Sequence, residues 1–586
     1  MPVTPTYPGV YIEEVPSGVR TITGVATSIT AFLGRALFGP TNEPVMMNSF
    51  GDFERQFGGL GVNYPLSYTA RDFYLNGGSQ AIIVRLYKEP ATASDAKASF
   101  TVDDLSLDAK TPGAWGKKLR ATIDVEVFDE MRTRLGLSTT DALFNLTIRF
   151  GNKVEKFLNL TVTDNARRID RVLKAESSLV DWRGVWPTST PSMAKVTAAR
   201  TALKTLNDAL KAVPPVQATI DAAKTAYETA KLELDDPVTK AEKKLAKALA
   251  AKPQVPADIT AAETELKTAE NNMKGSDGGA LDQAAYEGSK ENKTGIYALD
   301  KADLFNLLCI PPDTRDGDTL SAAYQTAMTY CKDRRAMLIV DSPIAWSNNK
   351  DTAAAAAKKG LPDLGLAGEA ARNAALYFPR VRETDPLRDG QIDTFVPCGI
   401  IAGVMARTDT ARGVWKAPAG LDAAINGIQG LNVTLNDAEN GMLNPLGINC
   451  LRIFPVNGRV VWGARTLRGA DQLADEYKYI PVRRLALYIE ESLYRGTQWV
   501  VFEPNDEPLW AQIRLNIGAF MHGLFRQGAF QGKTPRDAYF VKCDKETTTQ
   551  NDINLGIVNI VVGFAPLKPA EFVIIKIEQI AGQIET

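Results

Sequence analysis

The sequence is short of the residues from which catalytic and metal sites are usually built. It contains one histidine, His522, in 586 residues, and no two of its cysteines stand at a metal-ligand spacing. Imidazole and thiolate groups are the main zinc ligands and frequent general bases or nucleophiles. The composition therefore excludes a His-rich zinc site and leaves little material for an enzyme. We expect the cysteines to be buried free thiols: Cys309, Cys331, Cys398, Cys450 and Cys543.

Long apolar runs and an excess of one charge are also missing. No stretch of 18 uninterrupted apolar residues occurs, so no membrane-spanning helix and no direct membrane insertion are predicted. The first residues have neither a basic start nor an apolar core, and no signal peptide is expected. The net charge of −2 gives no strong field for nucleic acid. These features favour synthesis in the cytoplasm and exclude a nucleic-acid partner.

Two short strings resemble catalytic motifs but lack their spacing. Residues 528–534 (GAFQGKT) have three residues between the glycines instead of four, and Pro535 stands where a phosphate-binding helix would begin. Glu490 and Glu491 are adjacent on a predicted helix, where neighbours point about 100° apart and cannot share one substrate atom. His522, beside Met521 on an apolar helix face, is expected to be packed or hydrogen-bonded rather than to act as a general base. We predict no catalytic, metal or cofactor site and no enzyme.

The two ends of the chain carry an unusual signal. Residues 8–15 (PGVYIEEV) and 572–580 (FVIIKIEQI) are both typical of β-strands. Chain ends are usually frayed and polar unless something holds them. A strand at a free end presents unpaired backbone groups that fit a sheet edge, in its own subunit or in a neighbour.

Between the ends, the chain alternates strands and helices and is interrupted by a long insertion. Strands are predicted at 81–87, 304–310, 336–341 and 375–382, with helices at 67–75, 319–333 and about 366–374. This spacing indicates a parallel sheet, which strand 81–87 would join across the insertion. Later elements are a short helix near 421–429, helices at 482–495 and 508–526, and strands at 538–543 and 555–565.

The insertion changes character halfway along. Alternating runs at 98–103, 119–128 and 143–160 predict a small β-rich unit. Residues 191–273 are rich in Ala, Lys, Thr and Glu, and prolines at 214, 237 and 253 divide them into three or four helices of about 15–20 residues. We interpret this part as an antiparallel helical hairpin or small bundle. Its polar surface favours a decoration on the outside of an assembly.

Several sequence blocks occur together in one order. They are FGDFERQFGG at 50–59, FYLNGGSQAIIVR at 73–85, NLLCIP at 306–311, RAMLIVD at 335–341, AALYFP at 374–379, RGVWKAPAG at 412–420, GAFQG at 528–532 and AYFVKCD at 538–544. With PGVY at 8–11, the blocks resemble the tail sheath proteins of contractile phage tails and related contractile injection systems. The resemblance covers roughly residues 1–90 and 295–582 and leaves the middle uncovered.

The resemblance implies a multidomain fold of α/β and α+β type. The expected parts are an N-terminal exchange arm (1–21), a discontinuous parallel α/β core (22–90 with 295–395), and an inserted domain (91–294) with a β-rich part (91–187) and a helical hairpin (190–275). A mixed α+β C-terminal domain facing the tube (396–566) and a C-terminal exchange arm (567–586) complete the chain.

The resemblance also implies a function. Subunits would polymerise as stacked rings around an inner tube protein, between baseplate and terminal cap proteins, and contract from a metastable extended state to drive the tube through a target envelope. The product would be a phage tail or tail-like particle assembled in a bacterium.

In this family the terminal arms of neighbouring subunits complete a sheet in a third subunit, which assigns roles to named residues. The arm residues are Val10, Tyr11, Ile12, Val15, Phe572, Val573, Ile574, Ile575 and Ile577. The expected hinges are Gly18, Gly24, Pro566 and Pro569. The alternative is that both strands pair inside their own subunit.

Basic residues of the C-terminal domain are the predicted contact with the tube. They are Lys478, Arg483, Arg484, Arg495, Arg514 and Arg526. The alternative is that they form salt bridges inside the subunit with Glu490, Glu491, Asp506 and Glu507. A different function stays open as well, a surface- or carbohydrate-binding module of a particle that does not contract.

Overall fold

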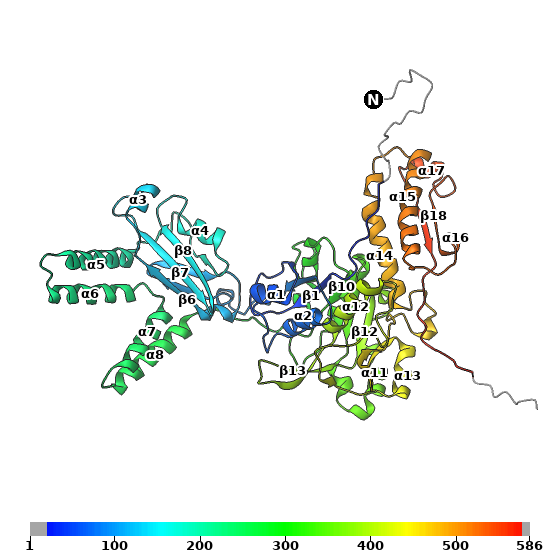
Figure 1. Cartoon of the computed structure of the whole chain (residues 1–586), viewed down its shortest axis with the longest axis horizontal. Coiled ribbons are helices and arrows are strands. Elements are labelled where there is room, and N and C mark those ends of the chain that lie inside the picture. The colour runs from blue at the N-terminus through cyan, green and yellow to red at the C-terminus, as the bar shows by residue number, and fades with distance from the viewer. Residues whose placement is uncertain (1–19, 577–586) are drawn as a thin grey trace, which may run out of the picture.

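The computed structural model describes residues 20–576, which form an elongated molecule of three parts in a row (Figure 1). The inserted part, with β6–β8 and helices α5–α8, lies at one end. The central part holds the large sheet, and the C-terminal part, with α14 and α15, stands at the other end. Among the described residues, no helix is long and apolar enough to cross a membrane.

The centre of the molecule is an eight-stranded sheet in the order β17-β16-β12-β11-β10-β1-β3-β2. Six strands run parallel, and the edge strands β2 and β17 are antiparallel to their neighbours. The strands are β1 (Thr30–Gly34), β2 (Val45–Met47), β3 (Ala81–Arg85), β10 (Leu307–Cys309), β11 (Met337–Asp341), β12 (Ala374–Phe378), β16 (Ile448–Phe454) and β17 (Gly458–Val461). Thr30 pairs with Ala81 on one side and with Leu307 on the other. This confirms that strand 81–87 joins the later strands across the insertion.

Both faces of the sheet are buried, so its central strands are continuous apolar runs rather than alternating ones. One face packs on α9 (Gln283–Glu287), α10 (Ser321–Asp333), α11 (Ala353–Gly360) and α13 (Asp437–Leu443). The other face packs on α1 (Phe50–Phe57), α2 (Pro65–Leu75) and α12 (Cys398–Arg412). Leu338 and Val340 point to the first face, whereas Met337 and Ile339 point to the second.

Two glycines of α12, Gly399 and Gly403, allow this helix to pack closely against the backbone of α2. A Cβ at Gly399 would lie 2.1 Å from the Thr69 carbonyl oxygen, and one at Gly403 would lie 2.5 Å from that of Phe73. Residues 398–406 of α12 are all buried, because the helix is enclosed by α2 and the sheet. A helix buried all round has no amphipathic period. That is why the sequence pattern did not predict α12.

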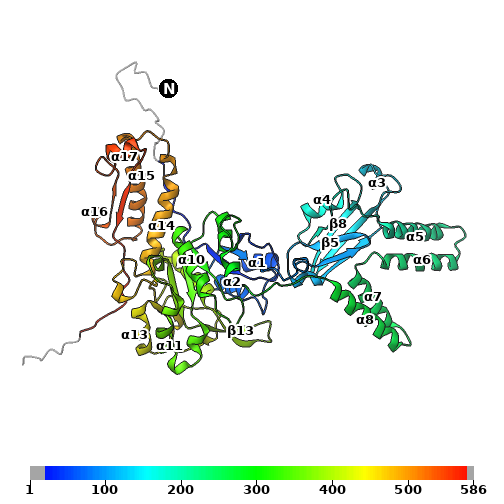
Figure 2. The ribbon, with the colours of Figure 1, turned by 180° about the vertical axis from the view of Figure 1, so that it is seen from behind.

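The inserted part has two three-stranded sheets and six helices. One sheet contains β4 (Ser99–Val102), β5 (Leu105–Ala109) and β9 (Val180–Trp182), and the other β6 (Leu119–Asp124), β7 (Leu143–Phe150) and β8 (Lys153–Thr161). The helices are α3 (Glu130–Leu135), α4 (Ile169–Glu176), α5 (Ala194–Lys211), α6 (Gln217–Leu232), α7 (Pro237–Ala250) and α8 (Pro256–Asn272). Helices α5 to α8 form two antiparallel pairs, which leave the sheets in different directions (Figure 2).

The two helical pairs repeat one sequence pattern at an offset of 39 residues. The residue types at 214, 216, 220, 225 and 229 recur at 253, 255, 259, 264 and 268. Each helical pair is buried only at the end next to the sheets, where Val196, Tyr227, Val238 and Met273 pack in the core of the inserted part. The outer turns are exposed. The segment predicted as one helical hairpin or small bundle is therefore two helical hairpins.

The C-terminal part consists of two long helices and a two-stranded ribbon. These are α14 (Ile480–Gly496), α15 (Glu507–Arg526), β18 (Tyr539–Lys542) and β19 (Val561–Phe564), with the short helices α16 (Pro535–Ala538) and α17 (Gln550–Asn554). Its core contains Trp510, Met521 and Phe530. A small separate sheet, β13 (Val381–Asp385), β14 (Gln391–Phe395) and β15 (Gly430–Leu431), packs beside the central part.

Several predicted boundaries differ from the structure. The helix predicted near 421–429 is absent, and the one at 366–374 is a 3₁₀ turn at Glu369–Asn373. The strand predicted at 375–382 is two strands, β12 and β13, separated at Pro379. The boundary placed at 396 cuts through one unit, since α12, β16 and β17 belong to the central core. The boundary at 294 falls too late, because Leu281 and Tyr286 already pack in that core.

Candidate subunit-coupling site

The β18–β19 ribbon is the least complete sheet of the molecule. Four residues of each strand pair in antiparallel register, with Tyr539 opposite Phe564. Its inner side packs on α15, whereas Phe540 and Val561 are about half exposed. Within residues 20–576 no third strand pairs with the ribbon. Two strands are marginal alone, and their outer edges carry backbone groups ready for added strands.

The end of the described chain is the most exposed apolar segment. Phe572, Val573, Ile574 and Ile575 are 73–83% exposed, and the segment runs away from the molecule (Figure 1). As far as Lys576, the segment pairs with no strand of its own subunit. Pairing inside the subunit, the alternative interpretation, is thus not seen for this part of the arm. Residues Val10, Tyr11, Ile12, Val15, Gly18 and Ile577 lie outside the described residues.

The predicted hinges lie in different surroundings. Pro566 forms an antiparallel bridge with Phe530, so it still belongs to the ribbon. Pro569 lines a groove of about 1130 Å³ whose other wall carries Trp415 and Trp462. Gly24 is not in a free linker: a Cβ there would lie 1.9 Å from the Tyr488 hydroxyl oxygen of α14. The glycine permits close packing, which corrects its assignment as a hinge.

Most of the predicted tube-contact residues are engaged inside the subunit. Arg495 pairs with Glu491 at 2.7 Å, Arg514 pairs with Glu507, and Lys478 pairs with Asp471 at 2.6 Å. Arg484 is buried, and its Nη1 lies 2.9 Å from Asp409 Oδ1. Arg526 is exposed at the end of α15, and no ion pair with another described residue is found for it. Salt bridges inside the subunit are thus found for five of the six, but only Arg483, Arg495 and Arg514 pair with acids that the alternative interpretation names.

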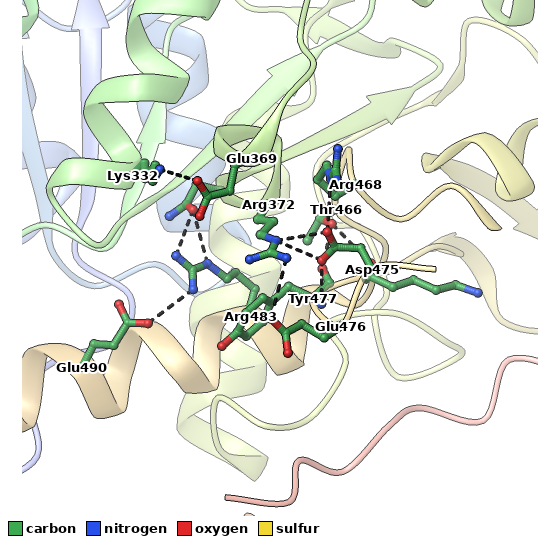
Figure 3. Close-up of polar contacts among 12 residues, drawn as sticks. Lys332, Glu369, Arg372, Thr466, Arg468, Asp475, Glu476, Tyr477, Arg483 and Glu490 are labelled. Carbon is green, nitrogen blue, oxygen red and sulfur yellow. Dashed lines mark hydrogen bonds and ion pairs between the residues drawn. The ribbon is translucent and has the colours of Figure 1, made fainter. Parts of the chain in front are cut away.

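Arg483 belongs to a wider network that joins α14 to the central part (Figure 3). It pairs with Glu490 at 3.3 Å, donates to the Asn373 side chain, and lies over the Tyr477 ring. Asp475, whose side chain is 2% exposed, accepts from Arg372 and Arg468 in the same network. A charge engaged on several sides is poorly suited to hold a sliding partner.

The remaining sequence predictions concern chemistry. All five cysteines are buried and unpaired, as expected, and burial raises the pKa of the Cys543 thiol to about 11. No group of three or more His, Cys, Asp or Glu side chains suited to a metal occurs in residues 20–576. His522 is exposed on α15 beside the Phe525 ring, so it is not buried in the apolar face as one part of the expectation had it.

Two family models match the chain in succession. The phage tail sheath protein central domain matches residues 288–467, and the phage tail sheath C-terminal domain matches residues 474–580. The chain belongs to the phage tail sheath family. Sheath proteins are structural, which confirms the prediction that this member is not an enzyme.

Characterised sheath proteins match over limited stretches. The tail sheath protein of Vibrio phage KVP40 is 32% identical over 127 residues, which is 22% of this chain and 18% of that protein. The tail sheath protein of Enterobacteria phage T4 is 26% identical over 165 residues, or 28% of this chain and 24% of that protein. The matched stretches thus span about a fifth to a quarter of the lengths of these relatives.

Solved sheath structures resemble nearly the whole chain in fold. The helical sheath of the anti-feeding prophage in its contracted state gives a TM-score of 0.52 at 20% identity, covering 98% of this chain and 100% of that chain. The sheath tail protein of Listeria innocua gives 0.54 at 12% identity, covering 93% and 96%. The mixed α/β multidomain sheath fold is therefore present over the described part of the chain, residues 20–576.

Proposed function

We propose that this chain is the subunit of a contractile sheath, which polymerises around an inner tube and contracts to drive the tube through a target envelope. Family membership over the central and C-terminal parts carries the proposal. The expected partners are copies of itself, the tube protein, and baseplate and terminal cap proteins. The product would be a phage tail or tail-like particle made in a bacterium, with the inserted part on its outside.

Subunits are held together by exchange of their terminal strands with the β18–β19 ribbons of neighbours. Two features support this. The exposed run Phe572–Ile575 is a strand-like segment without a sheet, and the β18–β19 ribbon is a sheet with room for further strands. Each added ladder hydrogen bond contributes about 1 kcal/mol net, and burial of the apolar arm side chains adds to it. The paired strands stay joined while the linkers bend.

Contraction needs no cofactor in this scheme. The extended sheath is kinetically trapped in a state of higher free energy than the contracted sheath, so the polymer itself stores the energy for contraction. A release of about 1 kcal/mol per subunit, the order of one net hydrogen bond, becomes large over many subunits.

The contact with the tube has to release during contraction, which favours weak and exposed charges. Of the six predicted basic residues, Arg526 fits this description best, because the others are paired or buried. Replacing Arg526 with Glu is expected to weaken the binding of tubes to sheaths at low salt, with less effect at high salt. Co-sedimentation of tube and sheath measures this, and equal binding by the variant would contradict the assignment.

Two deletions test strand exchange. Removal of residues 1–20 or 568–586 is expected to leave folded monomers that form no tubes, since the ribbons would then lack their added strands. Circular dichroism and negative-stain microscopy measure the two properties. Normal tubes after either deletion would contradict exchange, and a full-length chain that stays monomeric at high concentration would favour a binding module.

A further inference from the structure

The C-terminal arm is fixed to the central part at one point before it leaves the molecule. The Arg465 side chain is fully buried, and its Nε and Nη2 donate to the two carboxylate oxygens of Glu571 at 2.8 and 2.6 Å. Nη1 donates to the carbonyls of Asn444 and Gly469 and lies 3.0 Å from Asp471. Every donor nitrogen of the guanidinium is occupied. A two-point bond of this kind resists both stretching and rotation.

The N-terminal segment is held along α14 and, at its outer end, by α15. The Val25 N–H donates to Ser492 Oγ at 3.2 Å, and the Arg20 N–H donates to Asn516 Oδ1 at 3.2 Å. Ile22 is buried against Gly496, where a Cβ would come within 2.6 Å. Near the base of the helix, Arg484 donates to the Thr27 carbonyl at 2.9 Å.

The C-terminal attachment lies at the start of α14, and the N-terminal segment reaches the same place with Thr27. Tyr479, the residue before the helix, donates its hydroxyl to Glu571 at 3.1 Å and forms a backbone bridge with Arg465. Arg484, five residues later, holds Thr27 and is itself paired with Asp409. The same stretch joins two cores, since Ile480 packs in the central core and Leu485 in the C-terminal core.

From these contacts we infer that Arg465 anchors the C-terminal exchange arm at the start of α14, and that α14 anchors the N-terminal segment along its length from Arg484 to Gly496, so that tension between neighbouring subunits passes along this helix. The inference rests on the proposed strand exchange. It makes both arginines positioning residues: Arg465 fixes the point where the C-terminal arm departs, and Arg484 holds the inner end of the N-terminal segment.

The C-terminal anchor is tested with Glu571→Gln in the full-length chain. The Glu571 side chain is 15% exposed, but the amide oxygen of Gln can still accept one bond from Arg465, so the monomer should stay folded with only a small fall in melting temperature. The concentration needed for tube assembly should rise about tenfold, as for the loss of one charged contact. Glu546→Gln, at an exposed glutamate of the C-terminal part, is the matched control and should assemble normally. Arg465→Lys, which cannot form the two-point bond, should behave like Glu571→Gln if it folds.

The N-terminal anchor is tested with a pair of substitutions. Gly24→Ala places a methyl group on the Tyr488 hydroxyl and should displace the segment from α14, with loss of tubes. Adding Tyr488→Phe removes that oxygen and should restore assembly at least in part. Rescue of this kind would not follow from a general loss of stability.

The outcomes separate the anchor from strand exchange itself. If deletion of 568–586 abolishes tubes but Glu571→Gln assembles and contracts like the unchanged chain, exchange stands and the C-terminal anchor is wrong. If Gly24→Ala assembles normally, the N-terminal anchor is wrong. If the deletion itself leaves normal tubes, strand exchange is wrong and the anchor, which rests on it, is wrong as well. Assembly defects in Glu571→Gln, in a chain that stays folded with only a small fall in melting temperature, support the inference.

Discussion

At the scale of single residues, a buried acid pair links α2 to the small sheet. Asp72 and Glu383 have side chains 5% and 1% exposed, and both lie against Arg71. Burial raises the pKa of each carboxyl, and the nearby Asp72 charge raises that of Glu383 further. One guanidinium cannot neutralise two buried carboxylates, so the pair retains a proton at a pH where exposed acids have lost theirs.

This pair predicts a pH effect of defined sign. A carboxyl whose pKa is raised on folding favours the folded state below that pKa, and its contribution is lost as pH rises through it. A tenfold difference in proton affinity between the folded and unfolded chain corresponds to about 1.4 kcal/mol of folding free energy, which thermal unfolding can detect. Glu383→Gln should therefore lose less stability than the unchanged chain between pH 5 and pH 8 in thermal unfolding.

Asp385→Asn is the control of opposite sign. Burial acts to raise the pKa of Asp385, but hydrogen bonds from Tyr68 and Arg315 outweigh it and the pKa is lowered. Loss of this carboxylate should cost stability most at neutral pH and least in acid. Parallel pH profiles for the Glu383→Gln variant and the unchanged chain would contradict the shared proton.

The sequence did not distinguish anchoring arginines from surface ones. Arg484 was assigned to a tube contact, yet it is buried against Asp409, 75 residues earlier in the chain. Arg465 was not singled out, although its partner Glu571 lies at the root of a predicted arm. Pairing at such separations has no local signature. The only sequence feature that indicates a buried arginine here is its position beside an apolar run.

At the scale of elements, prediction succeeded where burial gave a simple pattern. Strands β3, β10 and β11 are apolar runs flanked by turns, and α14 and α15 have an apolar stripe. The helix α12 was missed because it is buried all round and contains two glycines. The sequence predicts β18 and β19 as strands. Whether a third strand joins them depends on tertiary contacts, which the spacing of apolar residues does not predict.

The glycines of α12 lead to a prediction with a built-in control. Gly403→Ala would force a methyl group to 2.5 Å from the Phe73 carbonyl and should destabilise the fold by about 1–3 kcal/mol. Gly518→Ala, on α15, meets no atom within 4 Å and should gain up to about 1 kcal/mol from helix propensity. Unfolding midpoints in denaturant measure both. Equal effects of the two substitutions would show that α2 and α12 can separate at little cost.

At the scale of the whole molecule, the inserted part is joined to the centre by two adjacent segments. The Gly279 N–H donates to the Lys88 carbonyl at 3.1 Å, and Lys88 pairs with Asp282 at 2.6 Å. The inserted part has its own core, whereas Leu281 and Tyr286 already belong to the central one. A deletion of residues 190–292 would therefore damage both cores, whereas excision between the two adjacent segments removes the inserted core as a whole and keeps Leu281 and Tyr286 in the central core.

Excision of residues 91–277 tests whether the inserted part is needed for assembly. Because the cut ends lie side by side, a short Gly-Ser linker can join them with little loop-closure cost. The shortened chain is expected to fold, to form tubes, and to contract like the unchanged chain, since neither the ribbon nor the two arm anchors is touched. Negative-stain microscopy before and after a contraction trigger measures this. Excision of 95–277 with the same linker serves as a control for the joint. If both shortened chains fold but form no tubes, the inserted part takes part in the sheath wall and is not a decoration.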